Sequence, residues 1–418
     1  MNTRRIFTTL VSFALFASCA SAAWGAWRAG GARLLAKYAG ASLASETARR
    51  AVRMSPEDPE THSALGLVLY NTKEAGALAE FERSAALRPR DYFLWLQLGR
   101  ARDDAGDAEG ALQALGEAMR LAPFYSAPRW QYGNVLYRRG RLDEAFAEMR
   151  RAAESNPTLY PALADLAWGT YRGDAGAVER VAAPRDALER LALARLFARK
   201  GRPDLALAHF RAAGEIDADD RRRFLKELLA ARQFAAAYEV WAGGREDARV
   251  GAGKGLFTEP GFEGRVNTSE LGFGWRQERA FEGVTLSVDT QSPNSGARSL
   301  LVEWGGHANP GVTVISQLVV VEPGARYRLS FHARTESVKT GGPPFVVVSD
   351  ASAEDARVLA ESKTLPQGTN AWQEYEVEFA STPKTEAVLV SLRRQNCDAN
   401  PCPMFGRVWL DDFSLRKL

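Results

Sequence analysis

The stretch PRDYFLWLQLGRARDDAGDAEGALQALGEAMRLA, residues 89–122, and the stretch of equal length that follows it decide the fold of the first half of this chain. Proline, glycine and alanine recur there 34 positions apart. The recurring positions are Pro89, Pro123 and Pro157; Gly99 and Gly133; Ala111 and Ala145; and Ala118 and Ala152. A period of this length, with small residues in both helices and a closing proline, is typical of stacked helix–turn–helix units.

The composition of the repeat has a packing explanation. Small residues such as Gly99 and Ala111 allow two helices to approach closely, while larger apolar side chains fill the space between units. Proline ends the second helix of each unit because it lacks an amide donor and clashes with the preceding turn. A single unit cannot bury its own apolar face, so we expect a stack.

These residues resemble the tetratricopeptide repeat. The clearest unit has Trp95, Leu98, Gly99, Ala111, Leu115, Ala118 and Pro123. The next unit has Arg129 in place of the tryptophan, and an earlier unit around Gly66 has a turn one residue short. A fourth unit begins at Leu166 and is expected to lose its second helix between Gly173 and Pro184. A fifth unit and a final helix pair extend the resemblance to Trp241, so that residues 29–246 are assigned to the array.

The resemblance implies that the first helices of the units line a concave groove that binds a protein or peptide. The residues at helical spacing along that face are Tyr70, Arg100, Trp130, Asn134, Tyr137, Arg138, Trp168, Tyr171 and Arg172. Exposed aromatic rings with arginines are typical of binding hot spots. The alternative is that some of these rings pack into the adjacent unit. The stripe lacks the lysine and asparagine set of the family's carboxylate clamps, which does not support a chaperone-tail ligand.

Residues 1–28 form a candidate export segment. Arg4 and Arg5 precede an uncharged stretch that ends at Trp27, and small residues surround Ser21. A cleaved signal peptide, an uncleaved membrane anchor and a lipoprotein signal ending at Cys19 are three alternatives. Each of them exports the rest of the chain to the periplasm or cell envelope, and the second also gives a membrane association. The formal net charge is +3 with both signs interspersed, which gives no argument for nucleic acid as a partner.

The pattern changes from helical to alternating after a glycine-rich linker at residues 247–256. Alternating segments separated by turn residues predict an antiparallel sandwich over residues 257–418. The expected strands are 284–289, 299–304, 312–321, 326–334, 345–349, 372–379, 386–393 and 407–416. The fold class is therefore multidomain, a helical superhelix followed by an antiparallel β-sandwich of the jelly-roll type.

Five short motifs in this second part resemble the jelly-roll carbohydrate-binding modules, a galactose-binding-like fold. They are Gly261-Phe262-Glu263, Phe273-Gly274-Trp275, Gly296-x-x-Ser299-Leu300, the segment from Val321 to Arg334, and Trp409 to Leu415. The resemblance implies a structural calcium ion held by Glu263 and Asp412, with neighbouring amides or arginines as the alternative partners of these carboxylates. A sugar site needs aromatic platforms and polar edges, and the candidates are Trp304, His307, Arg393 and Arg394.

Cys397 and Cys402 lie in a short turn-rich loop of an exported chain, which favours a disulfide over two free thiols. The sequence contains no zinc-protease motif and no nucleophile elbow, so we expect no enzymatic activity and no cofactor other than the calcium. The expected function is an exported bacterial scaffold that binds a protein or peptide through the groove and a polysaccharide through the sandwich. A purely structural protein of an exopolysaccharide export system and a glycoside hydrolase are the alternatives.

Overall fold

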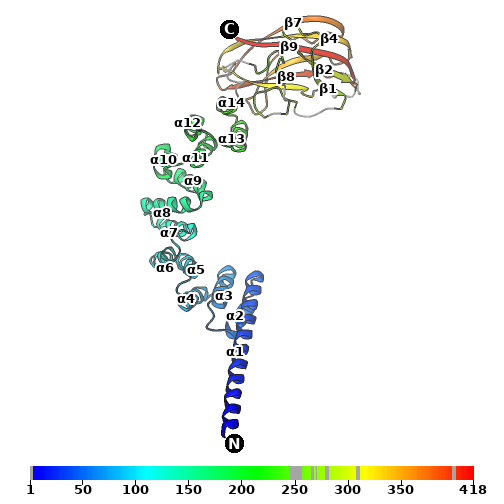
Figure 1. The fold of residues 1–418 in the computed structure, drawn as a ribbon. Coiled ribbons are helices and arrows are strands. Elements are labelled where there is room, and N and C mark those ends of the chain that lie inside the picture. The colour runs from blue at the N-terminus through cyan, green and yellow to red at the C-terminus, as the bar shows by residue number, and fades with distance from the viewer. Residues whose placement is uncertain are drawn as a thin grey trace. The chain divides into compact units, whose positions relative to one another are not determined.

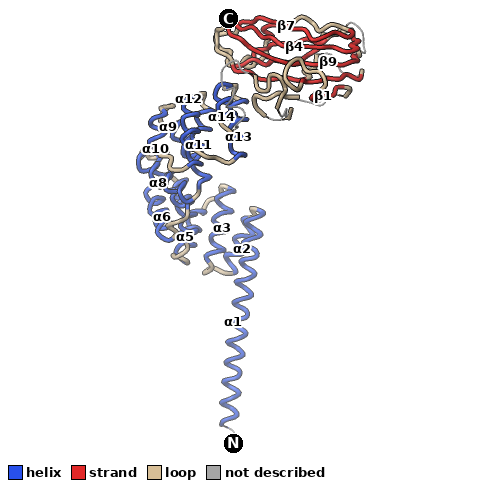
Figure 2. Tube along the Cα trace, turned by 45° about the horizontal axis from the view of Figure 1, so that its top comes forward, coloured by secondary structure: helices blue, strands red, loops and turns tan. Residues whose placement is uncertain are grey.

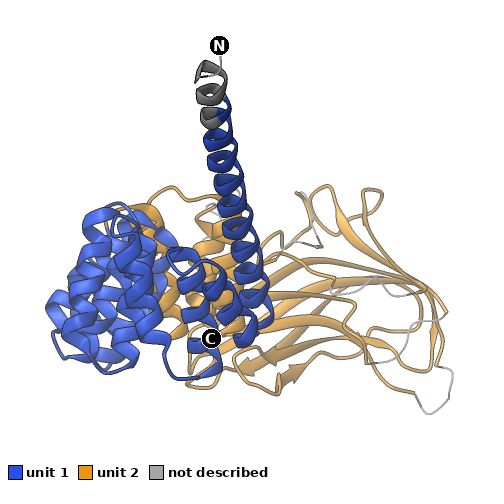
Figure 3. Ribbon diagram, turned by 90° about the horizontal axis from the view of Figure 1, so that it is seen from below, with its two compact units in different colours: residues 1–184 blue, residues 185–418 orange. Residues whose placement is uncertain are grey.

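A computed structural model describes residues 3–244, 257–264, 268–269, 271–277, 282–306, 311–397 and 402–418. Helices make up the first part of the chain and strands the last part (Figures 1 and 2). The chain divides into two compact units, residues 1–184 and residues 185–418 (Figure 3). The predicted linker at 247–256 lies outside the described residues.

The helices follow one another in antiparallel pairs. In the first unit they are α1 (Thr3–Ser42), α2 (Ser45–Met54), α3 (Pro59–Thr72), α4 (Ala77–Leu87), α5 (Tyr92–Asp104), α6 (Ala108–Leu121), α7 (Ser126–Arg138), α8 (Leu142–Ser155), α9 (Tyr160–Thr170) and α10 (Ala175–Ala182), with a 3-10 turn at Pro157–Leu159. In the second unit they are α11 (Ala187–Arg199), α12 (Pro203–Ala213), α13 (Ala218–Ala230) and α14 (Phe234–Ala242). The helical superhelix predicted from the period is confirmed.

Two helices of the first unit differ from the sequence-based expectation. The prediction that the fourth unit loses its second helix is wrong, because α10 forms there. The Asp174 carboxylate accepts a hydrogen bond from the Ala177 amide at its start, and Ala183, with φ 42°, ends it just before Pro184. The pair α1–α2 was not predicted as a repeat unit, since the apolar stretch in α1 hides the helical period of residues 29–42.

The small residues of the period lie where two helices touch. A Cβ atom on Gly99 would lie 2.5 Å from Leu115 Cγ, and one on Gly133 would lie 2.7 Å from Met149 Cγ. A Cβ atom on Gly66 would lie 2.9 Å from the Phe81 ring. Phe81 follows Gly66 one residue sooner than Leu115 follows Gly99, as the shorter turn of that unit predicts. A side chain at these positions would separate the two helices of a pair.

One position of the repeat makes the same hydrogen bond with three residue types. Trp95 Nε1 donates to the Pro89 carbonyl at 2.9 Å. Arg129 at the equivalent position donates to the Pro123 carbonyl at 3.5 Å, and Thr61 Oγ1 donates to the Ser55 carbonyl at 3.1 Å. The bond satisfies a carbonyl in the turn before each first helix. The unit with Arg129 in place of the tryptophan therefore keeps the hydrogen bond to the turn carbonyl.

The strands form two antiparallel sheets. They are β1 (Val284–Asp289), β2 (Ser299–Gly305), β3 (Ile315–Val320), β4 (Arg326–Thr340), β5 (Pro344–Asp350), β6 (Val358–Glu361), β7 (Gly368–Ala380), β8 (Ala387–Arg394) and β9 (Met404–Lys417). The sheet orders are β1-β2-β9-β4-β7 and β3-β8-β5-β6. The eight predicted strands are confirmed, with β4 longer than expected. The short, largely exposed β6 was missed because four residues carry too little alternation to predict a strand.

The sandwich motifs stabilise its core and its turns. Trp275 donates through Nε1 to the Glu259 carbonyl and contacts Phe262 and Phe413 in the core. The Tyr327 hydroxyl accepts a hydrogen bond from the Glu322 amide across the Pro323-Gly324 turn. Aromatic residues in the motifs therefore fix loops onto the core as well as filling it.

The burial of helix α1 changes along its length. Its second half packs against α2 and α3 through the buried Ala32, Ala36 and Ala39. Before this packed segment, Phe16, Trp24 and Trp27 are exposed. Across the described part of the chain, none of the helices has both the length and the apolar character that crossing a bilayer requires.

Within the second unit the last helix packs on the sandwich part. The Phe273 ring centroid lies 5.1 Å from that of Tyr238 and 5.7 Å from that of Trp241. Gly272, with φ 135°, brings the chain so close to Trp241 that a Cβ atom there would lie 2.3 Å from the indole. The Ala235 amide also donates to the Glu386 carboxylate at 3.3 Å. The helices α11–α14 and the sandwich therefore belong to one compact unit.

Candidate functional site

A cavity of about 400 Å³ lies between the first helices of successive units, α3, α5 and α7. We call it the α3–α5–α7 cavity. Its lining residues are Leu67, Tyr70, Phe81, Phe93, Gln97, Arg100, Ala101, Asp103, Asp104, Gln131 and Arg138. Three of the nine predicted groove residues, Tyr70, Arg100 and Arg138, therefore lie together. Tyr70 and Phe93 are 42% and 48% exposed, which leaves apolar surface for a ligand to cover.

Residues about one period apart bond to each other across this cavity. The Tyr70 hydroxyl donates to Asp104, and Arg138 forms an ion pair with Asp103. The hydrogen bond to Asp104 is the main cause that raises the pKa of Tyr70, with burial second. The Ser63 hydroxyl donates to Gln97 Oε1 at 2.7 Å. The repeat period thus places equivalent side chains of α3, α5 and α7 beside each other.

The other predicted groove residues do not join this cavity. Trp130 and Asn134 are partly buried on α7. Tyr137 is also partly buried, its hydroxyl lies 2.9 Å from Thr170 Oγ1, and its ring meets Phe146 edge-on. Tyr171 lines a second cavity of about 380 Å³ between α8 and α10, with Phe146 and Arg150.

The last two predicted groove residues lie near the end of α9. Trp168 is partly buried beside Gly173, and Arg172 is exposed with φ 50°. The rings of the stripe are therefore distributed between packing positions and open positions. Sequence reasoning did not select Gln97, Asp104 and Gln131, which line the α3–α5–α7 cavity one position to the side of the chosen stripe.

The four candidate sugar residues do not converge on one open surface. Trp304 is 4% exposed and belongs to the sandwich core. Arg394 is 2% exposed, and Arg393 is partly buried beside Phe345 in the other sheet. His307 lies outside the described residues. A buried ring offers no platform to a sugar, so the structure gives Trp304 a packing role.

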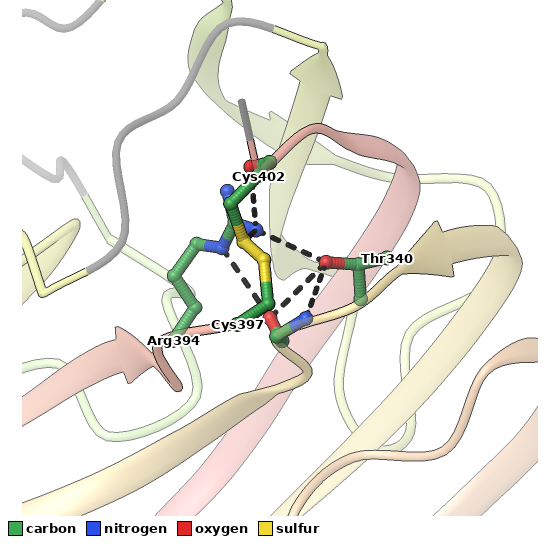
Figure 4. Close-up of a disulfide and its surroundings, with 5 residues drawn as sticks. Thr340, Arg394, Cys397 and Cys402 are labelled. Carbon is green, nitrogen blue, oxygen red and sulfur yellow. Dashed lines mark hydrogen bonds between the residues drawn. A yellow bond between two sulfur atoms is a disulfide. The ribbon is translucent and has the colours of Figure 1, made fainter. Parts of the chain in front are cut away.

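Arg394 and the disulfide form one structural cluster (Figure 4). Cys397 and Cys402 are bonded to each other, with Cα atoms 6.0 Å apart. The Arg394 guanidinium donates to the Cys402 carbonyl at 2.9 Å and to Thr340 Oγ1 at 3.1 Å. Burial lowers the pKa of Arg394. This arginine links Cys402 to Thr340 at the end of β4.

Exposed polar and aromatic side chains follow one face of β9, and we call this the β9 face. Phe405 is 50% exposed, and its ring lies against Gly306. Arg407, two residues along, forms ion pairs with Glu303 at 2.6 Å and Glu336 at 3.4 Å. Sugars bind to planar charged groups beside an aromatic ring, because hydroxyls pair with the former and C–H faces with the latter. The β9 face has both groups.

The β9 face continues to Trp409. This ring is buried under the Arg334 guanidinium, 4.3 Å from the ring centroid, and its Nε1 donates to Asp289 at 2.6 Å. The pKa of Asp289 is lowered, first by the hydrogen bond from the Gln291 amide and then by the one from Trp409. The sequence analysis missed this face. Alternation indicates that Phe405, Arg407 and Trp409 share one side of the strand, but which side faces away from the core follows only from the register of β9.

The predicted calcium ligands Glu263 and Asp412 both accept hydrogen bonds from the loop that contains Ser295 and Ala297. The Glu263 carboxylate accepts from the Ala297 amide at 2.9 Å, and Asp412 accepts from Ser295 Oγ at 2.6 Å. Asp411 is fully buried and accepts from the Asn294 amide at 2.9 Å, and burial raises its pKa. Within the described residues no group of three or more His, Cys, Asp or Glu side chains has metal-site geometry.

The donor set nevertheless suits calcium in its chemistry. A Cβ atom on Gly261 would lie 3.4 Å from an Asp411 oxygen, 3.6 Å from an Asp412 oxygen and 3.8 Å from Glu263 Cγ. Carboxylate oxygens thus face the same backbone, and oxygen is the ligand atom that calcium prefers. The assignment of Glu263 and Asp412 to a calcium ion stays a prediction.

Fold and motifs together define a tetratricopeptide-like array followed by a sandwich like that of carbohydrate-binding modules. Residues 254–399 match the protein family described as a carbohydrate binding domain. The human DnaJ homolog subfamily C member 3 is 24% identical over 192 residues, which are 40% of this chain and 38% of the relative. Its bovine counterpart is 29% identical over 102 residues, 24% of this chain and 20% of the relative.

This chain thus spans well under half the length of these curated relatives. Among solved structures, MamA shares 17% identity with a TM-score of 0.27, over 46% of this chain and 90% of that one. The CBM22-1 xylan-binding domain of Paenibacillus barcinonensis Xyn10C shares 16% identity with a TM-score of 0.28, over 40% of this chain and 97% of that one. The family matched by residues 254–399 is a binding domain by its description.

Proposed function

We propose that this protein is an exported, non-catalytic adaptor of the bacterial cell envelope. Its helical array binds a protein or peptide, and its sandwich binds a polysaccharide. The observation that carries the proposal is that each part has an open surface that combines aromatic and charged groups. These surfaces are the α3–α5–α7 cavity and the β9 face. The candidate export segment in residues 1–28 supports the location.

The polysaccharide part of the proposal is tested with a glycan array and the full-length chain. We expect binding that falls strongly in Phe405→Ala and in Arg407→Ala, because the first removes the platform and the second removes the planar donor. Arg326→Ala is the matched control, since Arg326 is exposed at the far end of β4. If no glycan binds, or if all three variants bind equally, the β9 face is not a sugar site.

Calcium binding is tested by thermal unfolding with added calcium or chelator. We expect calcium to raise the unfolding temperature of the protein with native Glu263 and Asp412. The paired variant Glu263→Gln with Asp412→Asn should lose that increase, because amides are weaker ligands for a hard cation. An increase that persists in the paired variant would assign the ion to another place.

The second candidate function is a purely structural role in assembly. The packing of Tyr238 and Trp241 on Phe273 favours it, because this contact joins helices to the sandwich. In that case variants of the α3–α5–α7 cavity and of the β9 face would leave partner and glycan binding unchanged, while Trp241→Ala would reduce assembly in cells.

A further inference from the structure

We infer that the α3–α5–α7 cavity binds an internal, extended segment of a partner protein in which an acidic side chain lies next to a large apolar one. This inference rests on the proposed peptide-binding role of the array and specifies the chemistry of the partner. It is drawn from the polar groups of the cavity that have no partner of their own.

The first such group is the Gln97 amide nitrogen. Gln97 is 6% exposed, and its Oε1 accepts the Ser63 hydroxyl hydrogen bond. Its Nε2 is buried, with no hydrogen-bond partner among the described residues. An unpaired donor in a buried position is costly, and such groups are normally satisfied by protein, water or ligand. Gln97 is one of the residues that line the cavity, so a ligand that opens the site at this side chain and inserts an acceptor there would satisfy the buried donor.

The second group is the Arg100 guanidinium, one helical turn along α5. The two carboxylates of the cavity already have partners, since Asp103 pairs with Arg138 and Asp104 accepts from Tyr70. Arg100 is exposed and forms no ion pair within the described part of the chain. The groups that require an acceptor from the ligand are therefore a cation and an amide donor. The Gln131 amide, which also lines the cavity, carries both a donor and an acceptor.

Gln97 is buried and Arg100 is exposed, and this difference determines which kind of acceptor suits each of them. A charged carboxylate beside the buried Gln97 would lose its hydration, so a neutral backbone carbonyl fits there better. A carboxylate can pair with the exposed Arg100 and stay hydrated on one side. An acidic residue inside a peptide chain offers both acceptors, a backbone carbonyl and a side-chain carboxylate. The exposed Leu67, Tyr70 and Phe93 complete the site as a contact for an apolar side chain.

The test is a selection from short random peptides with capped termini, displayed to the full-length chain. We expect the enriched peptides to have Asp or Glu within two positions of a large apolar residue. Arg100→Glu should change the preference from acidic to basic peptides, and Gln97→Met should weaken binding of the enriched peptides about tenfold. Arg90→Glu is the control, because Arg90 is exposed on the same unit and outside the cavity. Thermal unfolding of each variant verifies that the array is folded.

The outcomes separate this inference from the proposed function. If peptides are enriched but Arg100→Glu and Gln97→Met select and bind them as the native chain does, the cavity is not the site, and the adaptor proposal stands. A parallel selection uses the same peptides with free C-termini. If only peptides with a free terminal carboxylate are enriched, the ligand is a chain end and the inference is overturned, while the peptide-binding role stands. If no peptide is enriched in either selection, both the inference and the peptide-binding role fail.

Discussion

At the residue scale, single glycines decide whether two helices of a unit can pack. A Cβ atom on Gly99 would lie 2.5 Å from Leu115 Cγ and 2.8 Å from Leu115 Cδ2, so any side chain there collides with the core. Gly116 in α6 is equally helical but has no neighbour within 4 Å of a Cβ position. A side chain at Gly99 should therefore destabilise the array, whereas one at Gly116 should stabilise it.

We expect Gly99→Ala to lower the stability of the array by about 1–3 kcal/mol, because the added methyl group overpacks the helix pair. Gly116→Ala should raise it by up to about 1 kcal/mol, since alanine favours the helix over glycine. Urea unfolding followed by circular dichroism measures both. Equal shifts in the two variants would contradict the packing explanation of the period.

A second residue-scale prediction concerns Asp289, whose pKa is lowered by amide and indole donors. A carboxylate with a lowered folded-state pKa stabilises the protein above its unfolded pKa, near 4, and loses that effect as the pH falls through the folded value. Asp289→Asn should therefore lower the thermal stability at pH 7 and have a much smaller effect near pH 2–3. The exposed Asp355→Asn serves as the control. A pH-independent effect of Asp289→Asn would contradict the assignment.

At the element scale, the turns before α3, α5 and α7 each receive a hydrogen bond from one side-chain donor. Trp95, Arg129 and Thr61 donate to the carbonyl six residues earlier. Arg129 also forms an ion pair with Glu148 at 2.8 Å, with both side chains largely covered. The same turn is thus stabilised in three units by different chemistry.

We expect Trp95→Phe to cost about 0.5–1.5 kcal/mol, the typical net value of one hydrogen bond, because the ring packing is retained. Arg129→Leu should cost more, since Glu148 then keeps only Arg151 as a partner in a covered position. Arg129→Trp should recover part of that loss by restoring the donor. Thermal unfolding of the three variants gives the ranking, and a neutral Arg129→Leu would show that the turn is stable without the bond.

At the scale of the whole molecule, the last helices and the sandwich share one compact unit. Gly272 permits the contact with Trp241, and the Phe273 ring packs at an angle beside the indole. We expect Gly272→Val to separate α14 from the sandwich, because a side chain there has no space and φ 135° is unfavourable for it. Hydrogen exchange should then show faster exchange in α13 and α14 with the sandwich strands unchanged. Gly274→Val, with no neighbour within 4 Å, is the matched control.

The sequence by itself determined the repeat, the change from helices to strands, the strand positions and the disulfide pair. These features depend on local periodicity and on spacing along the chain, which the order of residues contains. Gly99 and Gly133 could be assigned to helix contacts for this reason. The short β6 and the first helix pair were missed, because the former has too few residues and the latter continues an apolar segment.

Only the tertiary structure decided which side chains meet. Tyr70, Arg100 and Arg138 line one cavity because α3, α5 and α7 stack side by side, whereas Tyr171 lines another. Trp304 lies in the core and Phe405 on the surface because the register of β2 and β9 determines which alternate residues face inward. Neither helix stacking nor strand register is fixed by local pattern, since both depend on the sum of contacts between distant segments.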